Sequence, residues 1–175
     1  MRKNYIHPET LTVSVDETGI LCSSNTKATM STSKPQNDAL KAVNDLYSGM
    51  TLKQKAAAMN LMMVLAGAGP NTPAYIAEIN KLMSMAGSYM QITGEQYKSY
   101  TSYFGDYRGM VNELKGVNNR AIYDSLFLSF FSIISVAKSE QALNVLLSIY
   151  SEFGYTEEDC YNVIQKADAL SKMMM

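Results

Sequence analysis

The sequence is short of histidine: the only one among its 175 residues is His7, which lies beside Pro8 in a tail-like N-terminal segment. Catalytic sites that pair serine or cysteine with histidine therefore cannot form on the rest of the chain, and zinc sites built on histidine are excluded for the same reason. A glycine-rich phosphate loop is also missing, because Gly67 and Gly69 are not followed by Lys-Ser/Thr and follow no strand. These absences predict that the protein is not an enzyme and leave only carboxylate–tyrosine chemistry open.

Charge of either sign is scarce as well: charged residues make up 18% of the chain, the net charge is −1 and the isoelectric point is near 5.8. Nucleic acids and anionic membranes attract strongly basic surfaces, so we expect neither as a partner. The two cysteines, Cys22 and Cys160, are too few for a disulfide framework. Unpaired thiols are typical of a reducing compartment, and we predict a cytoplasmic protein.

Long apolar runs are lacking too. Near the N-terminus, Glu9, Asp16 and Glu17 interrupt the sequence, and no secretory apolar region of about 7–15 residues is found. The longest apolar stretch, residues 126–137, is divided by serines and is shorter than the roughly 20 residues that span a bilayer. We predict that this stretch is a buried core helix and that the chain has no membrane span.

Residues 1–36 differ in composition from the rest and predict a flexible N-terminal arm. Residues 11–15 alternate polar and apolar side chains, which is typical of a strand. Residues 23–36 are almost entirely Ser, Thr, Asn, Lys and Pro, and such a linker buries too little apolar surface to fold. Two interpretations of the strand-like piece remain open: a mobile tail, or an edge strand offered to a partner's sheet.

What the sequence does contain is a helix–break–helix pattern that occurs twice. Each copy is an apolar run, a break, and a second helix that starts at a Ser/Thr cap and ends at a glycine. The caps are Thr72 and Ser139, and the terminal glycines are Gly87 and Gly154; both pairs are 67 residues apart. The apolar positions of the second helices correspond as well: Ile76 with Leu143, Ile79 with Leu146, and Leu82 with Ile149. The pattern predicts two helical hairpins related by a pseudo-twofold axis.

Residues 37–175 are therefore expected to form one all-α domain of about seven helices. Periodicity, caps and breaks place these helices at 38–48, 51–66, 72–87, 93–115, 119–138, 139–153 and from 157 onward. Thr156 is expected to cap the last helix, with Asp159 as its partner in an approximate capping box.

The predicted helix over 93–115 carries a row of tyrosines, which we regard as a candidate interaction surface. Its members are Tyr97, Tyr100, Tyr103 and Tyr107. Such a row packs against neighbouring helices in many bundles, but tyrosine is also enriched at protein–protein interfaces. Exposure of Tyr103, which lies off the main seven-residue repeat, distinguishes the second interpretation from the first.

The first break resembles a known family. An apolar helix that ends in small residues, followed by a Ser/Thr-Pro helix start, resembles the TerB-like (tellurite-resistance TerB) helical family, which reads Ala-Asp-Gly-x-x-Ser-Pro-x-Glu at this point. This chain reads Gly67-Ala68-Gly69-Pro70-Asn71-Thr72-Pro73-Ala74-Tyr75. The second glycine and the Thr-Pro start agree. The resemblance covers roughly residues 50–170 and implies an all-helical fold with a second, related half.

Two positions depart from the family pattern and bear on metal binding. Ala68 stands where the family has Asp, and Tyr75 stands where it has Glu; Ser135 and Ala142 occupy the equivalent places 67 residues later. The family's acidic loop implies binding of a divalent cation, and Ca²⁺ takes about 6–8 oxygen ligands, several of them carboxylates. We therefore predict that this loop binds no metal and that the protein carries no cofactor.

The resulting functional hypothesis is a non-catalytic interaction or scaffold module of a TerB-like, stress-associated type, with a protein partner or a second copy of the chain. The alternative is a small apolar-ligand-binding protein that uses a cavity between the two hairpins, with methionines as an adaptable lining.

Overall fold

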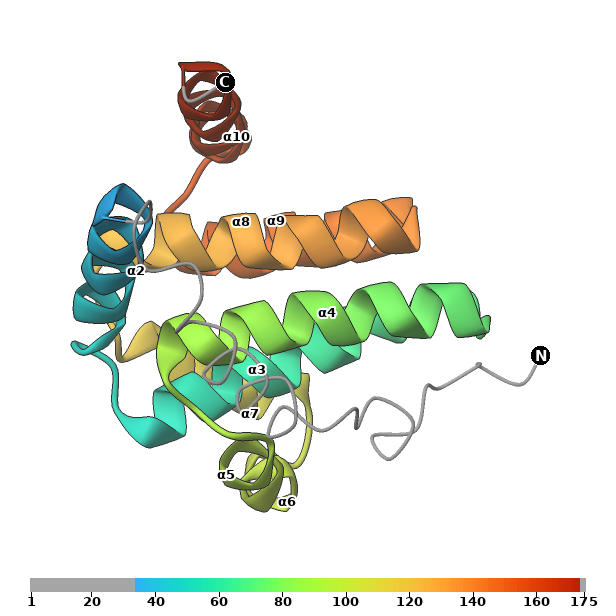
Figure 1. Cartoon of the computed structure of the whole chain (residues 1–175). Helices are drawn as coiled ribbons and strands as arrows, with labels where there is room; N and C mark the ends of the chain where they lie inside the picture. Colours follow the sequence, from blue (N-terminus) through green and yellow to red (C-terminus); the bar gives the residue numbers. More distant parts are fainter. Residues whose placement is uncertain (1–33, 174–175) are drawn as a thin grey trace.

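The computed structural model describes residues 34–173, and all regular structure in that range is helical (Figure 1). The all-α prediction is confirmed. In chain order the helices are α2 (Lys34–Tyr47), α3 (Leu52–Ala66), α4 (Pro73–Met90), α5 (Gly94–Ser99), α6 (Thr101–Phe104), α7 (Tyr107–Lys115), α8 (Arg120–Ala137), α9 (Glu140–Glu152) and α10 (Glu157–Met173).

The predicted arm lies almost entirely outside the described residues, and so does its strand-like piece at 11–15. Only its last residues can be compared with the structure. Because α2 begins at Lys34, residues 34–36 belong to a helix rather than to the linker. Pro35 fits there, since proline is tolerated in the first turn of a helix.

The helix starts that the sequence predicts in the two hairpins are confirmed. The Thr72 hydroxyl accepts a hydrogen bond from the Tyr75 amide, and Pro73 occupies the first helical position. In the second hairpin the Ser139 hydroxyl accepts from the Ala142 amide. A helix cap depends only on residues at the start of its own helix, so it can be predicted from the sequence.

One of the two predicted terminal glycines does not end its helix. Gly154 follows α9 with φ +85°, as expected, but Gly87 lies inside α4, which continues to Met90 and ends at a left-handed Gln91. The reason is packing: a Cβ atom on Gly87 would lie 3.1 Å from the carbonyl oxygen of Ile92. Gly87 lets the chain that leaves α4 fold back closely on the helix.

The predicted helix over 93–115 is also wrong, because the chain is divided there into α5, α6 and α7. Gly105 adopts φ +70°, a left-handed conformation that a helix excludes. Asp106 then caps α7 by accepting hydrogen bonds from the amides of Arg108 and Gly109. Gly105 therefore separates α6 from α7.

The core lies around α3, which is buried on nearly every side, as predicted for a central helix. α8 packs on both α3 and α4, whereas α9 packs chiefly on α8 and α10. The connections α3–α4 and α8–α9 lie at the same end of the bundle (Figure 1). The two hairpins therefore meet through α8. The short helices α5 and α6 lie on one side of the bundle, and α10 lies on the opposite side (Figure 1).

Candidate functional site

Tyr75 of α4 reaches back across the break between α3 and α4. The Tyr75 hydroxyl donates a 2.6 Å hydrogen bond to the carbonyl of Ala66, the last residue of α3. Burial raises the pKa of Tyr75 to about 12, so the phenol keeps its proton and remains a donor at neutral pH. Tyr75 thus adds a second hydrogen bond to the Ala66 carbonyl, which also accepts from the Gly69 amide at 3.1 Å.

The same break bears on metal binding. Ala68 and Asn71 are exposed and bring no carboxylate. Within residues 34–173, no group of three or more His, Cys, Asp or Glu side chains is placed to hold a metal ion. That this loop binds no metal stays a prediction for titration to check.

The four tyrosines of the predicted interaction surface do not share one face. Tyr97 on α5 is only 3% exposed and belongs to the core. Tyr100 is half-buried, Tyr107 is 36% exposed, and Tyr103 is 64% exposed. The division of the predicted helix into α5, α6 and α7 accounts for the scatter, because the four residues do not follow one helical periodicity.

Tyr103 is exposed but held in place by its neighbours. Its ring packs edge-on against Tyr100 and Phe104, with centroids 6.4 and 5.7 Å away. Lys53 of α3 donates a 2.7 Å hydrogen bond to the Tyr103 hydroxyl and forms a 3.0 Å ion pair with Glu113 of α7. We call these five residues, Lys53, Tyr100, Tyr103, Phe104 and Glu113, the Tyr103 patch.

A buried asparagine fixes the position of this patch on the core. Asn60 of α3 donates hydrogen bonds to the carbonyls of Ala56 (2.9 Å) and Tyr97 (2.8 Å). Its amide oxygen accepts from the hydroxyl of Thr101 at 2.8 Å. Both N–H groups and the oxygen of the amide are therefore used, and α5 and α6 are held to α3.

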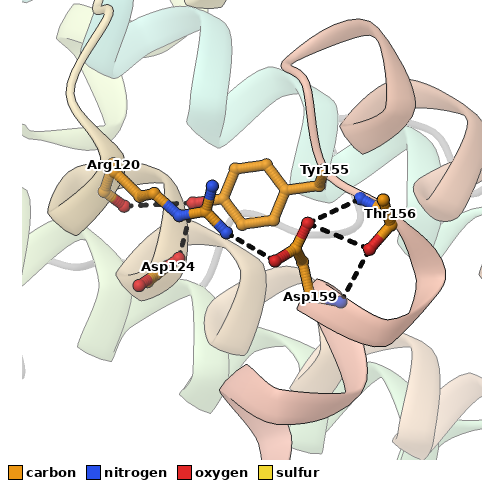
Figure 2. A network of polar contacts seen from close by, with 5 residues as sticks. All are labelled: Arg120, Asp124, Tyr155, Thr156 and Asp159. Atoms are coloured by element: carbon orange, nitrogen blue, oxygen red, sulfur yellow. Dashed lines mark hydrogen bonds and ion pairs between the residues drawn. The ribbon is translucent and has the colours of Figure 1, made fainter.

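A second polar network joins the start of α8 to the α9–α10 loop (Figure 2). The Tyr155 hydroxyl donates to Asp124, and the Arg120 guanidinium lies over the Tyr155 ring at 4.3 Å. Arg120 also forms a 2.9 Å ion pair with Asp159. Asp159 in turn accepts from the backbone and hydroxyl of Thr156, which confirms the predicted capping box.

The charged groups in this network already have partners: Arg120 is paired with Asp159, and Asp124 accepts from Tyr155. The hydrogen bonds from Thr156, followed by the contact with Arg120, lower the pKa of Asp159. Burial, followed by the hydrogen bond to Asp124, raises the pKa of Tyr155. A proton-transfer site needs a group that is free to exchange a proton with a substrate. This arrangement instead holds α10 against the start of α8, which is a structural role.

A groove of about 290 Å³ lies between the hairpins, where α2 and α4 face α8. Its apolar wall includes Met62, Leu82 and Met85. Along α8 the wall is a row of serines, and the first of them, Ser125, is hydrogen-bonded to Tyr47 of α2 at 2.6 Å. The cavity that the ligand hypothesis requires is therefore present as an open groove near the lower size limit of known ligand sites.

Within the described residues, α8 is the one helix long and apolar enough to cross a membrane, with a mean hydropathy of 1.4 over 18 residues. Core helices of globular folds pass the same test. Only 44% of these residues are buried, however. The prediction of a buried core helix therefore holds for one face of α8 and not for the other.

Sequence reasoning did not find the two polar groups around Tyr103 and Tyr155. Lys53 and Tyr103 are 50 residues apart, and Asp124 and Tyr155 are 31 apart. Only Thr156 and Asp159 gave a local signal, as a cap and its partner three residues later.

Comparisons with protein-family models, with curated proteins and with solved structures find no match for this chain.

Proposed function

We propose that this protein is a non-catalytic interaction module that binds a protein partner through the Tyr103 patch. The observation that carries the proposal is the state of Tyr103: its ring is 64% exposed, yet two aromatic rings and Lys53 fix its orientation. A large side chain that is already ordered loses little conformational entropy when a partner covers it. Exposed tyrosines of this kind are frequent among the residues that dominate binding energy.

The charges around Tyr103 favour a partner surface that is largely apolar. Lys53 is already paired with Glu113, so the patch offers no free charge of its own to an acidic or basic ligand. A partner that lays an apolar pocket over the Tyr103 ring keeps the Lys53–Glu113 pair at the rim, where ion pairs add specificity rather than affinity.

The TerB-like resemblance is part of this proposal. The all-helical fold and the Thr72-Pro73 helix start support it, and the non-acidic residues Ala68 and Tyr75 argue for a member without the metal site. We accordingly propose a stress-associated scaffold that works in the cytoplasm, with no enzymatic activity and no cofactor.

Affinity capture with the full-length chain tests the proposal. Tyr103→Ala should weaken capture of the partner about 10-fold or more, as expected for a central interface residue. The control is Tyr161→Ala on α10, because Tyr161 is comparably exposed (59%) and lies outside the patch. If the two variants capture the same proteins equally well, the patch is not the binding surface.

The groove between α4 and α8 favours a second candidate, a site for a small apolar ligand. Met62 and Met85 line it, and methionine adapts to ligands of irregular shape. An apolar fluorescent probe should bind the native chain, and Ala86→Phe, which fills the groove, should abolish binding. Ala77→Phe on the exposed face of α4 is the control. Equal probe binding by both variants would exclude the groove.

A further inference from the structure

Hydroxyl groups from three helices meet at the groove between α2, α4 and α8. α2 crosses the bundle where α4 ends and α8 begins (Figure 1). Tyr47, the last residue of α2, is hydrogen-bonded to Ser125 of α8 at 2.6 Å and lies within hydrogen-bonding reach of Ser129. Tyr89 of α4 lines the same groove, on the side away from α8. We call Tyr47, Tyr89, Ser125 and Ser129 the hydroxyl cluster.

The hydroxyl cluster is uncharged and can both donate and accept hydrogen bonds. Burial first, and the nearby Tyr89 with it, raise the pKa of the Tyr47 phenol, which therefore keeps its proton at neutral pH. The Ser129 hydroxyl donates to the Ser125 carbonyl at 3.4 Å. A hydroxyl oxygen that donates one hydrogen bond still has lone pairs with which to accept others. A group in the groove can thus donate to the serine oxygens and accept from the Tyr89 hydroxyl.

The other lining residues decide what kind of molecule fits. Leu82, Met85 and Leu128 form apolar walls, and no Lys, Arg, Asp or Glu is among the described residues that line this groove. A carboxylate or an ammonium group would therefore leave water without meeting an opposite charge, which is costly. A plain hydrocarbon would cover the serine oxygens without replacing their hydrogen bonds to water. A neutral molecule with an apolar body and one hydroxyl group avoids both penalties.

We propose that this groove binds a neutral aliphatic alcohol, whose hydroxyl is held by the hydroxyl cluster and whose alkyl chain lies against Leu82, Met85 and Leu128. The inference rests on the second candidate function, the use of the groove as a ligand site, and names the chemistry of the ligand. At about 290 Å³ the groove is near the lower size limit of ligand sites, so the alcohol is small. Met85 is 42% exposed in the empty groove, and the alkyl chain would cover it.

Displacement of Nile red, a neutral apolar dye, from the full-length chain tests the proposal. The competitors are 1-octanol and its isomer heptyl methyl ether, which accepts a hydrogen bond but cannot donate one. Octanol should displace the dye at a concentration about 5-fold lower than the ether, because only octanol can donate to the serine oxygens. Octanoate and octylammonium at pH 7 should be about 10-fold weaker than octanol or worse, because their charges find no partner in the groove.

Two variants remove one hydroxyl each and leave the shape of the groove nearly unchanged. Tyr89→Phe and Ser129→Ala should bind Nile red as the wild type does but lose most of the preference for octanol over the ether. Tyr161→Phe on α10 is the control for the first. Ser135→Ala is the control for the second, because Ser135 lies on α8 outside the groove and its hydroxyl also donates to the carbonyl four residues earlier. Both controls should keep the preference.

The outcomes separate this inference from the function on which it rests. If octanol and the ether displace the dye equally, while Ala86→Phe still abolishes dye binding, the groove remains a ligand site and the alcohol is overturned as its ligand. Octanoate or octylammonium as strong as octanol overturns it too. A preference for octanol that persists in both Tyr89→Phe and Ser129→Ala overturns the role of the hydroxyl cluster. A native chain that binds no dye and no octanol overturns the ligand site itself.

Discussion

The phenol ring of Tyr75 occupies the space that a side chain on Gly69 would need. A Cβ atom built on Gly69 would overlap the Tyr75 ring, while the Tyr75 hydroxyl reaches past it to the Ala66 carbonyl. The two residues therefore act together. Gly69 has no side chain and leaves room for the Tyr75 ring, and the Tyr75 hydroxyl is hydrogen-bonded to the last residue of α3. The hinge of the first hairpin is held by packing and a hydrogen bond between its own residues.

Gly69→Ala should therefore destabilise the fold. The added methyl group forces the ring out of its place, and overpacking of this kind costs about 1–3 kcal/mol. Urea unfolding measures the change. Gly94→Ala is the matched control, because a Cβ atom there meets nothing nearer than 4.0 Å, and its stability should stay level or rise slightly. Equal losses in the two variants would mean that the ring does not depend on Gly69.

Tyr75→Phe should lower stability by about 1 kcal/mol at neutral pH, because the Ala66 carbonyl loses the hydrogen bond from the hydroxyl and keeps only the one from the Gly69 amide. The pH dependence adds a sharper test. The folded pKa of Tyr75 is about 12, above the ordinary value of 10.0. Its contribution is therefore complete below pH 10 and is lost as the pH rises toward 12. The alkaline loss of stability should be smaller in Tyr75→Phe than in wild type. If Tyr75→Phe and the exposed-site control Tyr161→Phe have the same alkaline profile, the phenol is not buried as described.

Asn60→Leu should loosen α5 and α6 more than it changes the rest of the fold. The substitution removes the side-chain hydrogen bonds that tie the Tyr97 carbonyl and the Thr101 hydroxyl to α3, and each lost hydrogen bond costs about 1 kcal/mol. Hydrogen exchange read by mass spectrometry should show faster exchange over residues 94–104. Asn112→Leu on the exposed face of α7 is the control. Faster exchange spread evenly over the chain would contradict a local role.

Acid should weaken the attachment of α10. The hydrogen bonds from Thr156 and the ion pair with Arg120 hold the pKa of Asp159 below its ordinary value of 3.8. The contribution of this group is thus present above that value and is lost as the pH falls through the lower, folded pKa. The melting temperature of Asp159→Asn should depend less on pH between 5 and 2 than that of wild type. Asp168→Asn, near the C-terminal end of α10, should leave the wild-type slope unchanged.

Local signals in the sequence predicted much of the fold. Thr72, Ser139 and Thr156 were found as caps because a cap needs only its own helix. The helix end at Gly87 and the continuous helix over 93–115 were wrong for the opposite reason. At Gly87 the Ile92 carbonyl folds back closely on the helix. At Gly105 the chain takes a positive φ before the Asp106 cap, and neither event is marked by a local sequence signal.

The candidate surfaces were harder to predict from the sequence. The row of tyrosines was predicted, but which of them is exposed depends on how the separate helices α5, α6 and α7 pack. Lys53 comes to Tyr103 only through the packing of α3 on α6. The uncharged stripe of α8 was visible in the sequence as an apolar run; that one of its faces stays open is a property of the assembled bundle.

The most direct test of the proposed function is a hydrogen-exchange footprint of the full-length chain with and without its captured partner. We predict that amide protection increases over α6 and the adjoining part of α3 around Lys53, with no change over α10. Protection confined to α10, or no protection anywhere while the partner remains bound, would contradict the proposal that the Tyr103 patch is the contact surface.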